Sequence, residues 1–424
     1  MSAAAGSIKH LYDDNDLYVS DLINIFKLFG SYKINRDKVE EKFDGTNLFI
    51  SVVDGEIIIA RNKGHLKDFG QGSLRSEEAV KIFFVRLNNV SNAVALAYRE
   101  LSQIIKQSQQ AIDMFSDGRR WINVDIYEKG IQNIIMYPQP YISIHNFNEI
   151  DETGEIILTY EYGTVNKLLN LIEPIIKRQS YTYQIFGRKI LSINHKKVQE
   201  SIENLEKRLE NIDYLDSIFH TIGKAKCYWW KNLLRRKFNI INEELLKLIV
   251  GRFVYENKNV NLNVLKKQIN TEYPEQANEI IQYIQSGYKD DEDLVYRPLK
   301  ELIIDFENLV IQNTTNYIND DDLHINDMVQ RSHVKKVVYN LLDNIKMFGT
   351  FENKKKIDTN RHYLYHVGIN QFKAFEGIVF QYKTIKNWKE KQTYKLTGTF
   401  ASVNCLYNHN RYNENNESIT NTKT

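Results

Sequence analysis

The chain has 424 residues, of which 42% are hydrophobic and 26% are charged, and its formal net charge is +2 at pH 7. These values are typical of a globular protein with two domains, or with one core and a large insert. The nearly balanced charge excludes attraction of nucleic acid by the molecule as a whole, so any such site must be a local patch.

The cysteines and the first residues bear on where the protein works. Cys227 and Cys405 lie far apart and belong to no CxxC pair, which favours a reducing compartment. Residues 1–6 have neither the basic nor the apolar region of a secretion signal, and no stretch approaches the length of a membrane span. We therefore expect a soluble cytoplasmic protein, in the host cytoplasm if the source is a virus, with no membrane partner.

The first predicted elements are a short helix and a β-hairpin. Apolar residues at helical spacing predict a helix around 21–29 that ends at Gly30. Residues 39–47 lie in a β-prone segment, a second β-prone run follows at 48–53, and Asp54-Gly55 predicts a tight turn into a strand at 56–60. A lysine on a rigid strand, such as Lys42, can act as a nucleophile if nearby cations or burial lower its pKa from about 10.4.

The run EKFDGTN at 41–47 resembles the nucleotidyl-lysine motif, Lys-x-Asp-Gly, of the covalent nucleotidyltransferase superfamily of polynucleotide ligases and capping enzymes. The resemblance implies that Lys42 is the nucleophile, that Asp44, Gly45 and Asn47 surround the nucleotide, and that Glu41 reads the adenine amino group. The residues that flank the lysine are closest to phage-type ATP-dependent RNA ligases, because DNA ligases and capping enzymes usually carry arginine in place of Asn47. For this motif alone, the alternative is a plain hairpin with a solvated lysine.

Further motifs follow in the order that the family shows. Arg61, after the second hairpin strand, stands at the place of the arginine that contacts the ribose or the incoming 5′-phosphate end. Helical periodicity at 77–114 predicts core helices. Asp125, in the next strand, replaces the family's glutamate that accepts hydrogen bonds from the ribose hydroxyls. Tyr141 and Phe147 are both candidates for the aromatic side chain that stacks on the purine.

From 164 to 350 long helical periodicity replaces the strand pattern, which predicts a large all-helical insertion. Its size departs from the family, whose cores commonly pass from the third to the fourth motif in far fewer residues. A basic segment in it combines cations with tryptophans, as a surface that binds phosphates and stacks bases does. A solvated basic helix with two core tryptophans is the other interpretation. The residues concerned are Lys224, Lys226, Trp229, Trp230, Lys231, Arg235 and Arg236.

The strand pattern resumes after the insertion. The run EGIVF at 376–380 resembles the family's fourth motif, and the strand that bears Lys395 resembles its fifth. The resemblance implies that Glu376 holds the divalent metal, Mg²⁺ or Mn²⁺, and that Lys395 neutralises the α-phosphate and helps to keep Lys42 deprotonated. The family's paired Lys-x-Lys is incomplete here, with Thr393 in the first position. Lys391 shares a strand face with Lys395 by period two, so we expect it to serve the nucleotide as well.

The sequence therefore predicts an α+β fold: a nucleotidyltransferase core of ATP-grasp-like antiparallel sheets at 1–163 and 351–410, interrupted by the helical insertion at 164–350. The tail at 411–424 is expected to be disordered and leaves no room for a C-terminal OB domain. The expected activity is that of an ATP-dependent RNA ligase, which forms lysyl-AMP at Lys42 and seals a 5′-phosphate to a 3′-hydroxyl. The alternatives are a DNA nick ligase or another nucleotidyltransferase with the same core, and an inactive nucleic-acid or protein-binding module.

Overall fold

The computed structural model describes residues 8–31, 34, 39–43, 45–85, 88–128, 139–188, 190–255, 261–316, 376–388 and 391–398. These residues form a mixed α and β structure with mainly antiparallel sheets, compatible with the α+β class. No helix in the described ranges is long and apolar enough to cross a bilayer. Asp44, the expected core segment at 351–375 and the tail at 411–424 lie outside the described residues.

Distant parts of the chain meet in a four-stranded sheet with the order β1-β12-β11-β2. Its strands are β1 (Lys9–His10), β2 (Val39–Lys42), β11 (Gly377–Tyr382) and β12 (Gln392–Leu396). β11 is antiparallel to both neighbours, with Gly377 opposite Lys42 and Val379 opposite Lys395. Because paired residues point to the same side of a sheet, Lys42 and Lys395 share one face.

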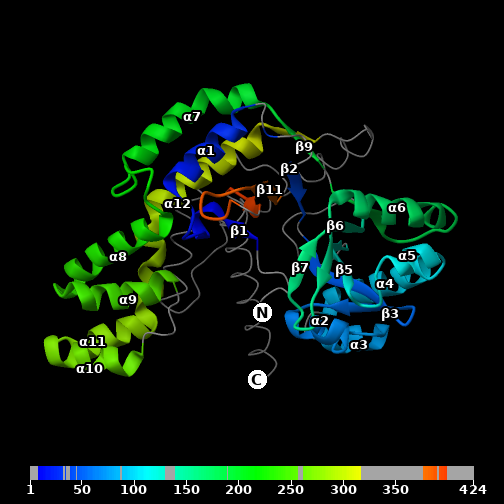
Figure 1. Cartoon of the computed structure of the whole chain (residues 1–424), viewed down its shortest axis with the longest axis horizontal. Coiled ribbons are helices and arrows are strands. Elements are labelled where there is room, and N and C mark those ends of the chain that lie inside the picture. Colours follow the sequence, from blue (N-terminus) through cyan, green and yellow to red (C-terminus); the bar gives the residue numbers. More distant parts are fainter. Residues whose placement is uncertain are drawn as a thin grey trace, which may run out of the picture.

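Helices cover the other face of the four-stranded sheet. α1 (Val19–Phe29), α7 (His195–Glu210) and α12 (Tyr288–Gln312) lie along it (Figure 1), and the short helix η1 (Leu11–Asp13) follows β1. The strands contribute Ile378, Phe380, Tyr394 and Leu396 to the core beneath these helices. The predicted helix at 21–29 is confirmed as α1, with Gly30 as its C-cap. The alternate residues of the strands point away from this core.

A six-stranded sheet lies beside the first sheet (Figure 1). It consists of β3 (Thr46–Val53), β4 (Glu56–Ala60), β5 (Arg120–Tyr127), β6 (Tyr141–Ile150), β7 (Ile156–Thr159) and the strand β8 (Gln184–Phe186), which is parallel to β6. The predicted hairpin is confirmed, because Asp54 and Gly55 have φ values of 52° and 74° between β3 and β4, as a tight two-residue turn demands.

The two faces of the six-stranded sheet have different neighbours. One face packs under α3 (Glu77–Phe83), α4 (Asn88–Ile105), α5 (Gln109–Asp113) and α6 (Tyr162–Ile176). On the other face, α2 (Lys63–Gly70) covers Phe49 and Trp121. Three further residues of that second face in β3 and β5 are polar and line a cavity: Asn47, Asn123 and Asp125.

The expectation that 164–350 is all helical is wrong for the described part of that segment. It contains the strands β8, β9 (Leu191–Ile193) and β10 (Thr314–Asn316), while α6 and α12 belong to the cores of the two sheets. Each of these strands has 3 residues, too few to show a period of two in the sequence. A helical unit with its own core does form around Trp230 (Figure 1), from α8 (Ile222–Phe238), α9 (Glu243–Tyr255), α10 (Leu262–Glu272), α11 (Ala277–Gln282) and η3 (Tyr283–Gly287).

Candidate active site

A cavity of about 270 Å³ lies between the two sheets. The four-stranded sheet lines it with the residues that point away from the helices, among them Glu40, Lys42, Val379 and Lys395. The six-stranded sheet lines it with Asn47, Asn123, Asp125, His145 and Asn146. Strand alternation in both sheets thus directs charged and polar side chains into one space.

Lys42 and Glu376 form an ion pair at this cavity. Lys42 Nζ contacts Glu376 Oε1, and the two side chains are 21% and 14% exposed. The contact follows from the strand register, in which Lys42 is paired with Gly377, the residue next to the glutamate. Burial raises the pKa of Glu376, the charge and hydrogen bond of Lys42 lower it, and the charge of Asp125 raises it. The lysine therefore provides the main counter-charge for a buried carboxylate.

Lys395 stands on the same wall, on β12, with β11 between it and the strand of Lys42. Burial and the positive charge of Lys42 lower the pKa of Lys395 below the ordinary value for lysine. The end of its strand is fixed by α12, where the buried carboxylate of Glu307 accepts backbone hydrogen bonds from Thr397 and Gly398 at 3.0 and 2.7 Å. The helical segment thus positions the strand that carries this lysine.

The other lysine expected in the fifth motif has a different place. Lys391 is exposed and lies outside the cavity lining. Thr393 borders the cavity at the position where the family has its first lysine. Among the described residues, Lys395 is therefore the lysine of this motif that lines the cavity.

Asp125 is the acceptor at the centre of the opposite wall and is 7% exposed. It accepts a hydrogen bond from Asn47 Nδ2 at 3.1 Å, and its other oxygen lies 2.9 Å from His145 Nε2. Burial works against its ionisation, but His145, Lys42 and Asn47 together bring the pKa of Asp125 below its ordinary value. Asp125 is therefore ionised at neutral pH and adds negative charge near Lys42.

His145 reaches the cavity because β6 contains a β-bulge. The pairing register shifts between Asn123 and Val124 of β5, so His145 of β6 is the extra residue. His145 and Asn146 both point into the cavity, and Phe147 returns to the core beneath the helices. Sequence reasoning missed both polar residues. The available signal was the consecutive polar pair His145-Asn146, but Asn148-Glu149 forms a second such pair in the same strand, so the signal was not specific.

Three residues of the expected nucleotide site have structural roles. A Cβ on Gly45 would lie 3.0 Å from Asp125 Cβ, so a glycine allows the chain to pass this close to β5. Asn47 Nδ2 also donates to Asn123 Oδ1 at 3.1 Å. Arg61 lies outside the cavity lining, and its guanidinium donates to the backbone oxygen of Asn47. Burial lowers the pKa of Arg61, while Asp125 opposes this shift. Arg61 therefore stabilises β3 from outside the cavity.

The register of β2 corrects the expectation for Glu41. Glu41 borders the cavity, but it is paired with Ile378, whose side chain belongs to the core beneath the helices. Glu40 instead shares the face of Lys42, and its carboxylate lies 2.5 Å from Arg188 Nη1. Burial raises the pKa of Glu40, whereas the charges of Arg188 and His145 lower it. Glu40 is therefore better placed than Glu41 to read a base in the cavity. No sequence signal indicated Arg188.

Neither aromatic candidate for base stacking lines the cavity. Tyr141 is 3% exposed and stacks on Tyr127, with ring centroids 5.3 Å apart. Phe147 is fully buried and packs against Phe115. Both residues are therefore core residues of the two sheets.

Two residues of the basic segment in α8 are buried. Trp230 is fully buried in the core of the helical unit. Lys226 is 6% exposed, and its Nζ donates a hydrogen bond to Asn15 Oδ1 at 3.0 Å. Burial lowers the pKa of Lys226 to about 8. The expectation that these two residues form a nucleic-acid surface is therefore wrong. Trp229 is partly exposed, and its Nε1 donates to the backbone of Asp213 at 2.9 Å.

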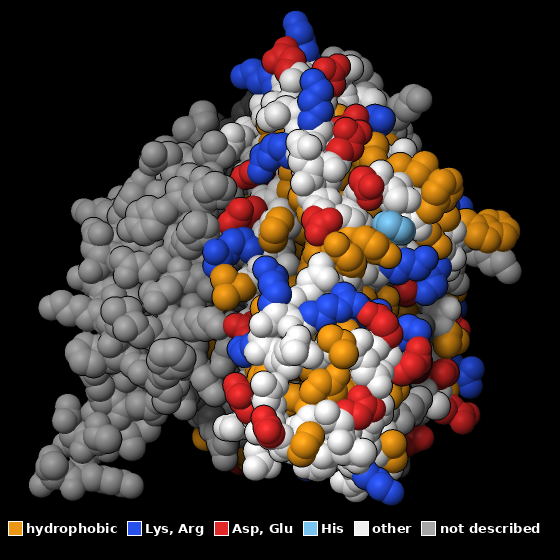
Figure 2. Space-filling view, turned by 90° about the vertical axis from the view of Figure 1, so that its left-hand side faces the viewer, with side chains coloured by type: hydrophobic (Ala, Val, Ile, Leu, Met, Phe, Trp, Pro, Cys, Tyr) orange, Lys and Arg blue, Asp and Glu red, His pale blue; other side chains and the backbone are white. Residues whose placement is uncertain are grey.

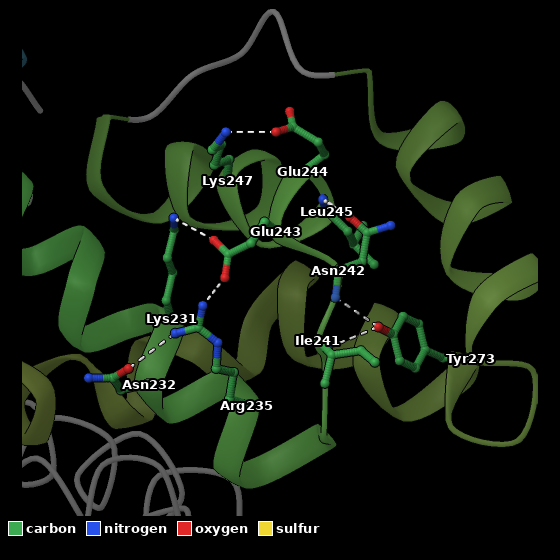
Figure 3. Close-up of polar contacts among 10 residues, drawn as sticks. All are labelled: Lys231, Asn232, Arg235, Ile241, Asn242, Glu243, Glu244, Leu245, Lys247 and Tyr273. Carbon is green, nitrogen blue, oxygen red and sulfur yellow. Dashed lines mark hydrogen bonds and ion pairs between the residues drawn. The ribbon is translucent and has the colours of Figure 1, made fainter.

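Acidic side chains neutralise part of the remaining segment. Figure 2 shows the side of the molecule on which the helical unit lies in Figure 1, and its Lys, Arg, Asp and Glu side chains are interspersed. Lys231 and Arg235 both pair with Glu243 at the start of α9 (Figure 3). Lys224 and Arg236 are exposed, so the prediction of a phosphate-binding surface now depends mainly on these two.

Carboxylates from both walls fit a divalent cation that binds together with a nucleotide. Glu376 and Asp125 influence each other electrostatically, and each interacts with Lys42. Mg²⁺ usually takes one or two protein carboxylates together with substrate phosphates and water. The described residues contain no group of three or more His, Cys, Asp and Glu side chains that could hold a metal alone. Glu376 and Asp125 thus match the donor set of a nucleotide-bound Mg²⁺.

Comparison with known proteins assigns no family to this geometry. No protein-family model matches the chain, and no curated protein sequence is significantly similar to it. The functional assignment therefore rests on the cavity and its residues.

Proposed function

We propose that the protein is an ATP-dependent polynucleotide ligase that forms lysyl-AMP at Lys42 and joins RNA ends. The observation that carries the proposal is the meeting of Lys42, Glu376 and Lys395, from separate parts of the chain, beside a cavity whose other wall presents Asp125. These are the residues whose motifs follow one another in the sequence in the family's order. This agreement supports a nucleotidyltransferase core, which is a more specific description than the α+β class.

The first step is attack by Lys42 Nζ on the α-phosphorus of ATP. The bond from this phosphorus to the bridging oxygen breaks, and pyrophosphate leaves with the electron pair. Lys42 must first part from Glu376 and lose a proton to solvent water. Lys395 offers its positive charge to the phosphates from the same wall. Glu376 and Asp125 would hold a bound Mg²⁺, which would supply further neutralisation of phosphate charge.

The AMP then moves to a polynucleotide end. An oxygen of a 5′-phosphate attacks the AMP phosphorus, the P–N bond breaks, and its electron pair returns to Lys42. A 3′-hydroxyl then attacks the 5′-phosphate phosphorus, and AMP leaves. Both steps reuse the cations that stabilised the first one.

Glu40 supports the choice of ATP over GTP. Its carboxylate faces the cavity beside Lys42, and carboxylate oxygens accept hydrogen bonds but donate none when ionised. Adenine carries an amino group at the position where guanine has a carbonyl oxygen. An ionised Glu40 can therefore accept a hydrogen bond from the amino group of adenine but not from the carbonyl of guanine, which favours ATP. The preference for RNA depends on the resemblance at 41–47, and a DNA nick ligase would use the same chemistry.

Incubation with α-³²P-ATP or α-³²P-GTP and Mg²⁺, followed by 5′-phosphorylated RNA or nicked DNA, tests the proposal. We expect protein label from ATP that is chased onto RNA as adenylated ends and joined product. Label that moves only to nicked DNA would favour the DNA nick ligase. Well-folded protein that is not already adenylylated and takes no label would favour the binding module.

A further inference from the structure

Arg188, which follows β8, joins the two walls of the cavity. Its Nη1 donates to Glu40 Oε1 at 2.5 Å on the four-stranded sheet. On the six-stranded sheet, its Nε donates to the backbone oxygen of His145 at 2.8 Å and its Nη2 donates to Asn146 Oδ1. All three nitrogens of the guanidinium thus make hydrogen bonds in its plane, which fixes the orientation of that plane.

Tyr162 of α6 covers one side of this plane. Arg188 Cζ lies 4.8 Å from the centroid of the Tyr162 ring, and Tyr162 Oη accepts a hydrogen bond from the backbone N–H of Arg188 at 2.6 Å. Gly187 makes this approach possible, since a Cβ there would lie 1.8 Å from Tyr162 Oη. The aromatic ring therefore supports the guanidinium from behind.

Arg188 belongs both to the bridge between the two sheets and to the wall of the cavity. Arg188 lines the cavity, and its side chain is 13% exposed. Since the edges of the guanidinium are bonded to Glu40, Asn146 and His145 and one face lies on Tyr162, the opposite face is the part of the group left for a ligand. It is a flat, positively charged surface of fixed orientation.

The described lining of the cavity offers no comparable aromatic surface. It contains no Tyr or Trp, and its one Phe, Phe380, is 1% exposed and packs edge-on against Phe29. The ring of His145 is held by Asp125. Guanidinium planes stack on nucleobases, and a cation over a π system is attractive.

We propose that the nucleobase of the bound nucleotide stacks on the guanidinium of Arg188, which Tyr162 supports from behind. The proposal deepens the proposed function, because it assigns the base subsite of the same nucleotide cavity. Stacking does not depend on the hydrogen-bonding groups of the base. Arg188 therefore contributes to the affinity for ATP and GTP alike, while Glu40 distinguishes between them.

Calorimetric titration of wild type, Arg188→Lys and the control Arg178→Lys tests this assignment without any chemical step. Arg178 is an exposed arginine at the end of α6. The probes, each with Mg²⁺, are α,β-methylene-ATP and α,β-methylene-GTP, which cannot transfer a nucleotide, and tripolyphosphate, which has no base. Thermal unfolding checks that each variant is folded. If Arg188→Lys does not fold, Tyr162→Leu removes the supporting ring and is expected to act in the same direction.

Loss of the planar group in Arg188→Lys should raise the Kd of both nucleotide analogues about tenfold and leave the Kd of tripolyphosphate unchanged. An equal loss for tripolyphosphate would overturn the proposal, as would unchanged binding of the analogues or a wild type that binds them no tighter than tripolyphosphate. A wild type that binds the analogue but takes no label from ATP would refute the ligase activity alone.

Discussion

Lys42 is paired with a carboxylate, which would have to release it before the proposed attack on ATP. Its ammonium contacts Glu376, and Lys395 lies on the same face of the sheet. An amine attacks phosphorus only through a free electron pair, so the ion pair opposes attack. Under the proposed function, the phosphates of a bound nucleotide would attract Lys395 and a divalent cation would attract Glu376. Nucleotide binding would then be coupled to release of Lys42.

Removal of the charge of either Glu376 or Lys395 should slow formation of lysyl-AMP at Lys42. We expect Glu376→Gln and Lys395→Met each to reduce the single-turnover rate about 100-fold, because each removes a charge that acts on the phosphates or their metal. Lys386→Met is the matched control, since the ion pair of Lys386 with Asp16 is exposed, and it should keep the wild-type rate. Rates of both site variants within a few-fold of wild type would remove these residues from the chemistry.

Glu40 should make the free energy of unfolding depend on pH. Burial raises the pKa of Glu40 above 4.5, against the charges of Arg188 and His145. The folded state therefore favours its protonated form, so its contribution to stability is fully present below the unfolded pKa and is lost as the pH rises through the folded pKa. Urea unfolding of wild type and Glu40→Gln should show the advantage of wild type shrinking as the pH rises above about 4.5. A constant difference across this range would contradict the shift.

At the scale of elements, the bulge in β6 decides which residues reach the cavity. It lets His145 and Asn146 both face the cavity without moving Phe147 out of the core. Since side chains in a regular strand alternate, two consecutive residues on one side require such an insertion. The bulge therefore adds a functional residue while both sides of the sheet keep their packing.

Deletion of His145 should be tolerated better than deletion of its neighbour Ile144. Without His145, Ile144 and Asn146 become consecutive and remain opposite Val124 and Asn123, which is a regular register. Without Ile144, His145 would take its place opposite Val124 and enter the apolar core. We expect the second deletion to cost about 3 kcal/mol more in urea unfolding, from the lost isoleucine and the buried imidazole. Equal losses would show that the bulge itself stabilises the sheet.

The sequence predicts those site residues whose position follows from local pattern. The Asp54-Gly55 turn follows from local sequence and is confirmed. The shared face of Lys42 and Lys395, by contrast, follows from the pairing of their two strands with β11, which alternation along one strand does not give. Arg188 could not be predicted, because its place depends on contacts between two sheets that no periodicity records. The burial of Trp230 could have been predicted, because it precedes Leu234 by four residues on α8 and both lie on the same helix face, where both are fully buried.

At the scale of the whole molecule, the cavity lies where two separately packed cores meet. The core of the four-stranded sheet backs one wall, and the core of the six-stranded sheet backs the other. The helical unit lies on the far side of the four-stranded sheet from the six-stranded sheet (Figure 1). A polynucleotide that contacts this unit would have to extend along the molecule to reach Lys42.

Contact between RNA and the exposed cations of α8 can be tested. If RNA phosphates contact them, Lys224→Ala combined with Arg236→Ala should weaken RNA binding and reduce the slope of log K against log salt by about 1.4, which is about 0.7 for each of two contacts with single-stranded RNA. Lys247→Ala is the control, because Lys247 is exposed on α9 and paired with Glu244 (Figure 3). An unchanged slope in the double variant would show that RNA does not contact these cations.

Peptide mass mapping can detect the covalent bond between Lys42 and AMP on which the proposed function depends. Protein incubated with ATP and Mg²⁺, then denatured and digested, should carry the mass of one AMP on the peptide that contains Lys42, and Lys42→Ala should carry none. An adduct on another lysine, an adduct from GTP alone, or no adduct in folded protein would contradict the proposed function.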